Sequence, residues 1–400
     1  MDIKVTVAGD LMCSLPQLRA SMKNGKYDFS SVFKPIKSLL MQSDYVIGNL
    51  ETPIAGETFG YTNSATCFNT PIEFPEAANS AGFDCLTISN NHCLDRGIDG
   101  LFSTIDNLSS RGIDFTGAYK NESDASEPFV KSINGVKLAI LSFTYGTNSQ
   151  WLNNKLPEDK RFCVDLFRGQ DEYIMNARSP FSLAIAPIKE MAKIILPQKV
   201  REIIKPIVIE DCVQGFDASP LDEYYDDRLR DKIYKAKERA DIVVMCMHSG
   251  GQFNSRIGEY TYNLAHRLVD YGCDFIIGAH PHCVLKYEMY HNGFIAYSLG
   301  NFCFTPNYGY CYKGVYSDYS VLINLYFNKL TRELNRKTIT ITKTVIKSKD
   351  SSVVYPISLL LSQVSNKQKS QLIEDSKAVL RRFNLNTIDV DFEQPEIEIS

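Results

Sequence analysis

Residues 275–282 read FIIGAHPH, an apolar run that stops at a turn carrying two histidines. The aromatic and β-branched residues at 275–277 are typical of a short buried strand. Pro281 constrains the turn between His280 and His282, so the two imidazoles can be directed toward two neighbouring metal ions. A backbone constrained in this way loses little entropy when a metal binds. The stretch therefore predicts a strand that ends at a metal site; the alternative is a pair of unrelated surface histidines.

The same order of apolar run and polar turn recurs along the chain. Runs that are typical of strands cover residues 3–8, 45–47, 83–89, 136–143, 242–247, 275–277 and 294–298. Segments with helical spacing of apolar residues lie between them, at about 30–42, 97–110, 222–240 and 257–272. Strands and helices in regular alternation predict an α/β layered fold.

Side chains that can bind metal follow these strands at the points where the strands end. They are Asp10, Glu51, Asn91, His92, His248, His280 and His282. Four of the six histidines are in this set, and ligand sites of layered α/β folds form where loops leave the carboxyl ends of strands. We therefore expect one convergent polar pocket; the alternative is an independent structural role for each histidine.

The donor set combines carboxylate, amide and imidazole groups and needs no thiolate. This chemistry favours Mn, Zn or Fe over Ca or Cu(I). Two such ions about 3.5–4 Å apart can clamp a phosphoryl-like group and activate water. Glu51 is the natural bridge, because its negative charge offsets the repulsion between two cations.

Five motifs occur in a fixed order along residues 3–305. They are Gly9-Asp10, Gly48-Asn49-Leu50-Glu51-Thr52-Pro53, Asn90-Asn91-His92-Cys93-Leu94-Asp95-Arg96-Gly97, Gly278-Ala279-His280-Pro281-His282 and Tyr297-Ser298-Leu299-Gly300-Asn301-Phe302. The series resembles that of the CapA-type poly-gamma-glutamate capsule biosynthesis proteins, which belong to the calcineurin-like metallophosphoesterase superfamily. The resemblance implies a four-layer α/β/β/α sandwich with a site for two divalent metal ions at the strand ends.

The resemblance also implies a role for each matching residue. Asp10, Glu51 and His282 would hold one metal, and Glu51 would bridge to a second that is held by Asn91, His248 and His280. His92 would protonate a leaving group, with Asp95 orienting it. Asn49 and Asn301 would line the pocket. Arg96 lies inside the third motif and is expected to meet an anionic substrate; a solvated surface position is the alternative for it, as for Arg256 and Lys286.

Two positions depart from the patterns of these families. The wider superfamily opens with Asp-x-His, whereas Met12 occupies the third position here. Capsule-type members share this loss, so the first metal would have one imidazole fewer. Between the third and fourth of these motifs the family usually shows His-Trp-Gly, but this chain reads His248-Ser249-Gly250-Gly251. That change removes an aromatic wall beside the site.

Composition excludes several classes of protein. The formal net charge is −4, which argues against a nucleic-acid binder. No signal peptide and no apolar run of the ~20 residues needed to span a membrane are visible, so a cytoplasmic location is expected. The eleven cysteines are scattered along the sequence without paired spacing, and they are expected to be reduced thiols. Cys93 and Cys283 are expected to be packing residues.

The chain divides into residues 1–305, a capsule-type metallophosphoesterase domain with an insert at about 150–219, and residues 306–400. The last part is expected to be a β-hairpin and a helical extension packed on the domain. Residues 185–209 carry five basic residues and three prolines. This segment is expected to be a lid over the site; binding to a membrane surface or to a membrane-bound synthase is the alternative.

These features predict a metal-dependent hydrolase of a phosphoester or related bond, linked to poly-gamma-glutamate or capsule polymer synthesis. The expected partner is an anionic polymer or a phosphorylated substrate. The alternative is a non-catalytic accessory protein that keeps the fold and binds the polymer during synthesis or export.

Overall fold

A computed structural model describes residues 2–64, 66–150, 152–170, 223–253, 256–305, 314–348 and 351–399. The predicted insert is therefore described only up to residue 170. This described part contains the 3-10 helix η2 (Glu158–Cys163). The basic segment at 185–209, with its predicted roles as a lid or a membrane contact, lies outside the described residues.

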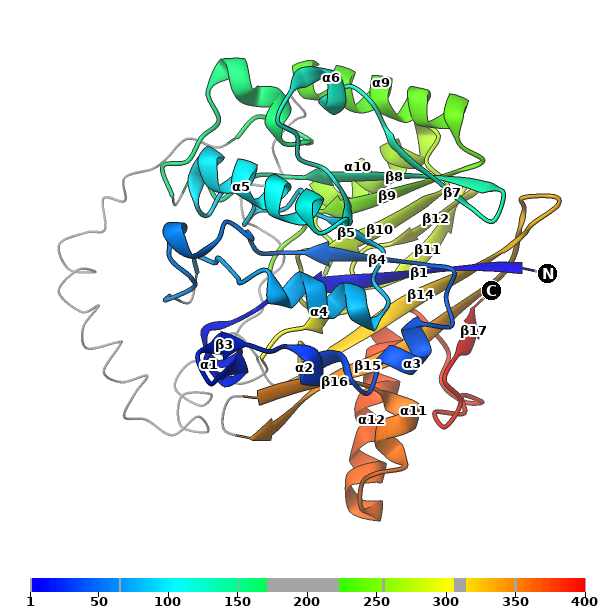
Figure 1. Cartoon of the computed structure of the whole chain (residues 1–400). Helices are drawn as coiled ribbons and strands as arrows, with labels where there is room; N and C mark the ends of the chain where they lie inside the picture. Colours follow the sequence, from blue (N-terminus) through cyan, green and yellow to red (C-terminus); the bar gives the residue numbers. More distant parts are fainter. Residues whose placement is uncertain are drawn as a thin grey trace, which may run out of the picture.

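Two β-sheets form the centre of the molecule (Figure 1). The first has the order β16 (Ser351–Pro356), β15 (Leu334–Ser348), β14 (Tyr319–Asn328), β1 (Asp2–Leu11), β4 (Tyr45–Leu50), β5 (Cys85–Thr87) and β6 (Asp114–Thr116), with β13 (Asn301–Cys303) paired to β1 and β17 (Ile397–Ile399) paired to β15. The second has the order β11 (Tyr287–Tyr290), β12 (Gly293–Ala296), β10 (Phe275–Ala279), β9 (Ile242–His248), β8 (Val136–Thr144) and β7 (Phe129–Ile133). A separate short hairpin joins β2 (Met22–Lys23) to β3 (Lys26–Tyr27).

The three large clusters of the hydrophobic core in the described part of the chain define four layers. One cluster joins side chains of both sheets, including Val5 and Ile323 from the first and Ile140 and Ile277 from the second. The other two clusters lie between each sheet and its covering helices. The predicted α/β/β/α sandwich is therefore confirmed, because apolar residues on both faces of each sheet require cover on both sides.

Helices cover the outer face of each sheet. The first sheet is covered by α1 (Leu15–Ser21), α2 (Ser30–Phe33), α3 (Lys37–Leu40), α4 (Glu73–Ala81) and α5 (Gly97–Ser110). The second is covered by α9 (Glu223–Arg239) and α10 (Glu259–Asp270). Short elements α6 (Glu122–Ala125) and η1 (Glu57–Phe59) lie in connections. Buried residues of α5 fall at helical spacing, at Leu101, Ile105 and Leu108, as an amphipathic helix requires.

The predicted helix over about 30–42 is two short helices, α2 and α3. Pro35 lies between them. Proline has no backbone N–H and clashes with the preceding turn, so it interrupts the hydrogen-bond ladder of a helix. The apolar spacing is nevertheless satisfied, because Phe33, Ile36 and Leu40 are all fully buried.

The C-terminal segment adds strands to the first sheet. β14 runs antiparallel to β1 along most of its length, with Ile3 opposite Phe327 and Val7 opposite Ile323. The predicted hairpin is formed by β14 and β15. α11 (Ile357–Leu361) and α12 (Asn366–Arg382) contribute Leu360, Leu372 and Leu380 to the cluster that joins the two sheets. No helix among the described residues combines the length and the apolar character needed to cross a membrane.

Candidate metal centre

Parallel strands bring the predicted ligands to one end of the two sheets. β1 and β4 are parallel neighbours, and they place Asp10 and Glu51 at the same edge of the first sheet. β9 and β10 are parallel neighbours in the second sheet, with His248 opposite Ala279 and His280 next in the chain. The two sheets pack face to face (Figure 1), and these strand ends supply ligand atoms that lie close to one another.

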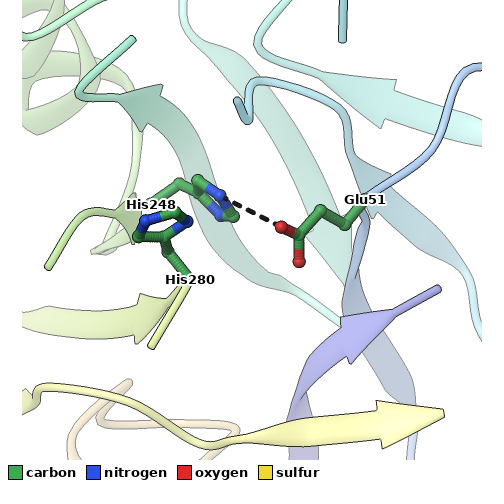
Figure 2. A group of neighbouring side chains, drawn as sticks. All are labelled: Glu51, His248 and His280. Atoms are coloured by element: carbon green, nitrogen blue, oxygen red, sulfur yellow. Dashed lines mark ion pairs between the residues drawn. The ribbon is translucent and has the colours of Figure 1, made fainter. Parts of the chain in front are cut away.

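Within the described part of the chain, two groups of three side chains could each hold a metal ion, and Glu51 is common to both. One group is Glu51, His248 and His280, which Figure 2 shows converging from opposite sides. The other is Asp10, Glu51 and His282. The ligand atoms of each group lie within 4.8 Å of one another. Glu51 Oε1 is 3.5 Å from His248 Nε2 and 3.8 Å from His282 Nε2.

The carboxylate of Glu51 fits a cation better than it fits the protein around it. The residue is fully buried, and neither carboxylate oxygen has a hydrogen-bond partner among the described residues. Nδ1 of His280 is likewise buried without a hydrogen-bond partner in the described part of the chain. A buried carboxylate without donors is costly unless a cation compensates it. The residues present therefore fit divalent metal ions.

Burial sets the protonation of these groups when no cation is bound. It raises the pKa of Glu51 well above its ordinary value, and the neighbouring negative charge of Asp10 adds to this rise. Burial and the nearby imidazoles lower the pKa of His248 and His280 well below the ordinary value. Neutral imidazoles are the form that binds metal, so the histidines are ready to act as ligands at neutral pH.

The backbone at the two histidines of the fourth motif is held in an uncommon conformation. His280 has φ +95° and His282 has φ +56°, in a region that costs non-glycine residues about 1–3 kcal/mol each. His280 N–H donates to Asp10 Oδ2 at 3.3 Å, which ties the turn to β1. Gly278 is required just before it, because a Cβ there would lie 2.0 Å from the carbonyl oxygen of Tyr297.

Two asparagines hold the ligands in place. Asn49 Nδ2 donates to Asp10 Oδ1 at 2.7 Å and lies 3.3 Å from His248 Nδ1. Asn301 Oδ1 lies 2.9 Å from His282 Nδ1, and its Nδ2 donates to the carbonyl oxygens of His282 and Ser317. The bond to Asn301 leaves Nε2 of His282 for a metal. Both amides thus bond ligand residues, and their predicted place in the lining of the pocket stays a prediction.

Asn91 reaches the site from the loop after β5. Its Oδ1 lies 2.9 Å from His248 Nε2, so the two atoms face the same space as Glu51. Its Nδ2 donates to Asn148 Oδ1 at 3.2 Å. Asn148 follows β8 and was not predicted as a site residue. The polar run after this strand was visible in the sequence, but nothing in it indicated which side chain would reach Asn91.

His92 and Asp95 form a buried pair beside the ligands. His92 Nδ1 lies 2.8 Å from Asp95 Oδ2, and the same oxygen accepts the backbone N–H of Phe68 at 2.6 Å. The Phe68 ring meets the imidazole of His92 edge-on, with 4.7 Å between ring centroids. The pair is therefore held by the loop that follows Glu51 as well as by its own turn.

The predicted substrate contact Arg96 is bonded to that same loop. Its guanidinium donates to the carbonyl oxygens of Gly60 and Asp95 and to Cys67 Sγ. Of the other two cations considered, Lys286 pairs with Glu288 at 2.7 Å. Cys93 and Cys283 are buried, and burial raises the pKa of the Cys93 thiol to about 12, as is typical of an inert packing residue.

Aromatic rings that sequence reasoning did not select surround the imidazoles. The Tyr145 ring is 4.7 Å from that of His280, and those of Phe253 and Phe304 are 5.2 and 6.4 Å from that of His282. Met12 is buried in a small apolar cluster with Phe68 and Phe304. The position where the wider superfamily carries an imidazole therefore belongs to an apolar wall.

Comparison with known proteins agrees with the motif series. The family model described as bacterial capsule synthesis protein PGA_cap matches residues 4–306. The chain belongs to this family. It is 26% identical over 315 residues to the capsule biosynthesis protein CapA of Bacillus anthracis, covering 76% of this chain and 60% of that protein. It is 25% identical over 304 residues to the PGA biosynthesis protein CapA of Bacillus subtilis (strain 168), covering 76% and 63%.

This member of the capsule synthesis family thus spans about three fifths of the length of these curated relatives. The resemblance found in the sequence is confirmed at the level of the family. Among solved structures, TT1561 of Thermus thermophilus aligns with 8% identity and a TM-score of 0.34, covering 84% of this chain and 98% of that chain. A TM-score this low supports no conclusion about this chain.

Proposed function

We propose that this protein is a metal-dependent hydrolase of a phosphoester or related bond that acts in the synthesis of a capsule polymer. The observation that carries the proposal is Glu51, a fully buried carboxylate with no hydrogen-bond partner among the described residues, shared by two groups of potential ligands. A carboxylate in this position is costly without cations and useful with them. The family relation supplies the capsule context.

Asp10, Glu51 and His282 would hold one ion, and Glu51, Asn91, His248 and His280 the other. Mn, Zn or Fe at these positions would neutralise the negative charge of the substrate and lower the pKa of the attacking water. Asn49 and Asn301 keep the ligands oriented. The rings of Tyr145 and Phe304 pack beside the imidazoles of His280 and His282 and would lower the local dielectric, which strengthens electrostatic interactions at the site.

His92 would act as general acid. Its Nδ1 is bonded to Asp95 Oδ2, so the proton it transfers to the leaving oxygen is carried on Nε2. Asp95 orients the ring and stabilises the imidazolium that precedes this transfer. Phe68 packs on the imidazole and keeps it in place.

The substrate class follows from charge and from the family. A site built for cations recognises anionic groups, which a phosphorylated precursor or an anionic capsule polymer would supply. We further propose that the protein acts in the cytoplasm next to a membrane-bound synthase, and that it does not bind nucleic acid, since its net charge is −4.

The test is metal analysis of the purified protein together with turnover of a generic aryl phosphate and of gamma-glutamyl polymers. We expect bound divalent metal and hydrolysis that a chelator abolishes. His92→Asn should reduce turnover by about 10²–10⁴-fold and leave metal content unchanged. His291→Asn is the matched control, because that imidazole is 69% exposed. Undiminished turnover of His92→Asn would exclude the acid role.

One observation favours the alternative of a non-catalytic polymer-binding accessory protein. Met12 is buried in an apolar cluster, so the Asp10 group has a single imidazole, His282. An accessory protein would bind the polymer with substoichiometric metal and show no turnover of either substrate. Stoichiometric metal with chelator-sensitive hydrolysis would exclude it.

A further inference from the structure

The loop after β8 is fastened to the turn that carries Asn91. Asn148 Oδ1 accepts the Nδ2–H of Asn91 at 3.2 Å. Asn154 Nδ2 donates to the carbonyl oxygen of Leu94 at 2.9 Å. Two side-chain amides of one loop therefore bond the same turn of a neighbouring sheet.

The bond to Asn148 determines which end of the Asn91 amide faces the site. An asparagine side chain has one acceptor oxygen and one donor nitrogen, and only the oxygen can coordinate a cation. Asn148 Oδ1 is an acceptor, so it holds the nitrogen of Asn91 and leaves Oδ1 beside His248 Nε2, at 2.9 Å. If the amide of Asn91 were rotated by 180°, its Oδ1 would face Asn148 Oδ1, and two acceptors would meet there. Its Nδ2 would then face the site, where it would meet either a protonated His248 Nε2 or a cation.

The backbone at Asn148 explains why asparagine suits this place. Its φ is +56°, a left-handed conformation that Asn and Asp adopt more readily than other side chains except glycine. Its carbonyl oxygen accepts the N–H of Leu152 at 3.0 Å. Gln170 Nε2 bonds Thr147 Oγ1 in the preceding position. The side chain thus projects from a loop that is held on both sides.

We propose that Asn148 is a positioning residue of the metal centre, which fixes the amide of Asn91 with its oxygen toward the metal beside His248. The inference rests on the proposed function, because it requires a metal ion beside His248. Partners of this kind typically contribute 10–100-fold to metal affinity.

The experiment is Mn²⁺ titration of the metal-free full chain by isothermal calorimetry, with circular dichroism as the check of folding. N148G removes the amide and permits φ +56°. It should therefore weaken Mn²⁺ binding at the position that includes Asn91 by about tenfold or more. N148D keeps an acceptor oxygen and should stay within about threefold of wild type. N134G is the matched control, because Asn134 also has positive φ, +49°, and bonds Asp44 at the other end of β8; it should bind Mn²⁺ as wild type does.

A double-mutant cycle separates positioning from general destabilisation. If Asn148 acts through Asn91, N148G should add no further loss of affinity in an N91A background. A loss of the same size in both backgrounds, or N148D as weak as N148G, would overturn the inference. If N148G does not fold, N148A takes its place in the comparison with N148D. If wild type binds Mn²⁺ and N148G binds it with the same affinity, this inference alone is overturned. If wild type binds no Mn²⁺, the proposed function and the inference are overturned together.

Discussion

Two buried charged clusters in this protein have opposite properties. Lys232 on α9 and Asp165 have side chains only 3% and 2% exposed, and they form an ion pair of 2.6 Å. Tyr119 completes this cluster, since its hydroxyl accepts from Lys232 and donates to Asp165, each at 2.8 Å. Glu51 is buried as deeply, but neither of its oxygens has a hydrogen-bond partner within the described residues. The charged groups of the first cluster satisfy one another, whereas the hydrogen-bonding capacity of Glu51 is unused within the described part of the chain.

The difference shows which buried charges indicate function. A paired charge contributes to the architecture, and removing one partner leaves the other uncompensated. A buried carboxylate without hydrogen-bond donors contributes little to folding, and under the proposed function it serves to bind a cation. Burial alone does not distinguish the two cases, whereas the presence or absence of hydrogen-bond partners does.

The largest effect on stability is expected when the satisfied cluster is broken. Lys232→Met leaves Asp165 buried without a counter-ion and should lower the free energy of unfolding by about 3–5 kcal/mol, measured by chemical denaturation. Metal content per folded molecule should not change. Lys235→Met on the same helix is the control, because its ion pairs are partly exposed and contribute at most about 1 kcal/mol. A loss below that value for Lys232→Met would show that the pair is not a structural element.

The unsatisfied cluster should respond in the opposite way. Glu51→Gln removes the shared carboxylate and should weaken metal binding by more than about 100-fold, a larger loss than a residue outside the ligand set causes. In a chelator, its free energy of unfolding should equal or exceed that of wild type, since a neutral amide replaces a carboxyl that has no donor.

Metal at 100 times its dissociation constant should stabilise wild type by about 2.7 kcal/mol and the Glu51→Gln variant much less. Thermal unfolding with and without Mn²⁺ measures this difference. Glu57→Gln, at an exposed position in the same loop, should behave as wild type. Severe destabilisation of metal-free Glu51→Gln would contradict the contrast between the two clusters.

Glu396 is hydrogen-bonded like the first cluster but is less deeply buried, with a side chain that is 19% exposed. Its substitution is expected to have the smallest effect. Burial alone would raise its pKa, but hydrogen bonds from Lys4, Thr338 and Tyr326 lower the pKa below the ordinary 4.5. Because the pKa in the folded protein is lowered, Glu396 stabilises the fold at pH values above 4.5, and this contribution is lost as the pH falls through the folded-state pKa.

Glu396→Gln should therefore cost about 1–2 kcal/mol at neutral pH, and the cost should shrink toward zero in acid. Denaturation curves of wild type and variant between neutral and acid pH measure this. Glu393→Gln is the control, because its carboxylate is 65% exposed in its pair with Lys369. A cost that does not change with pH would show that ionisation of Glu396 does not contribute.

Much of this architecture was readable from local patterns. Apolar runs and helical spacing predicted β1, β4, β9, β10, α5 and α10 because each pattern reflects which face of its own element is buried. The ordered motifs predicted the family, and the polar residues at strand ends predicted a convergent site. The helix expected over 30–42 was wrong in one detail, since Pro35 divides it into α2 and α3.

The amino-acid order alone was enough for the α/β pattern, the family and the candidate ligands, because these depend on contacts close in the chain or on motifs. It did not reveal that Asn301 bonds His282, that Arg96 is bonded to the 60–67 loop, or that Asn148 holds Asn91. The first and last of these pairs are 19 and 57 residues apart, and their partners meet through the register of parallel strands and the course of two loops. Such distances are set by the packing of the two sheets against each other, so the same side chains could be recognised in the sequence while their partners could not.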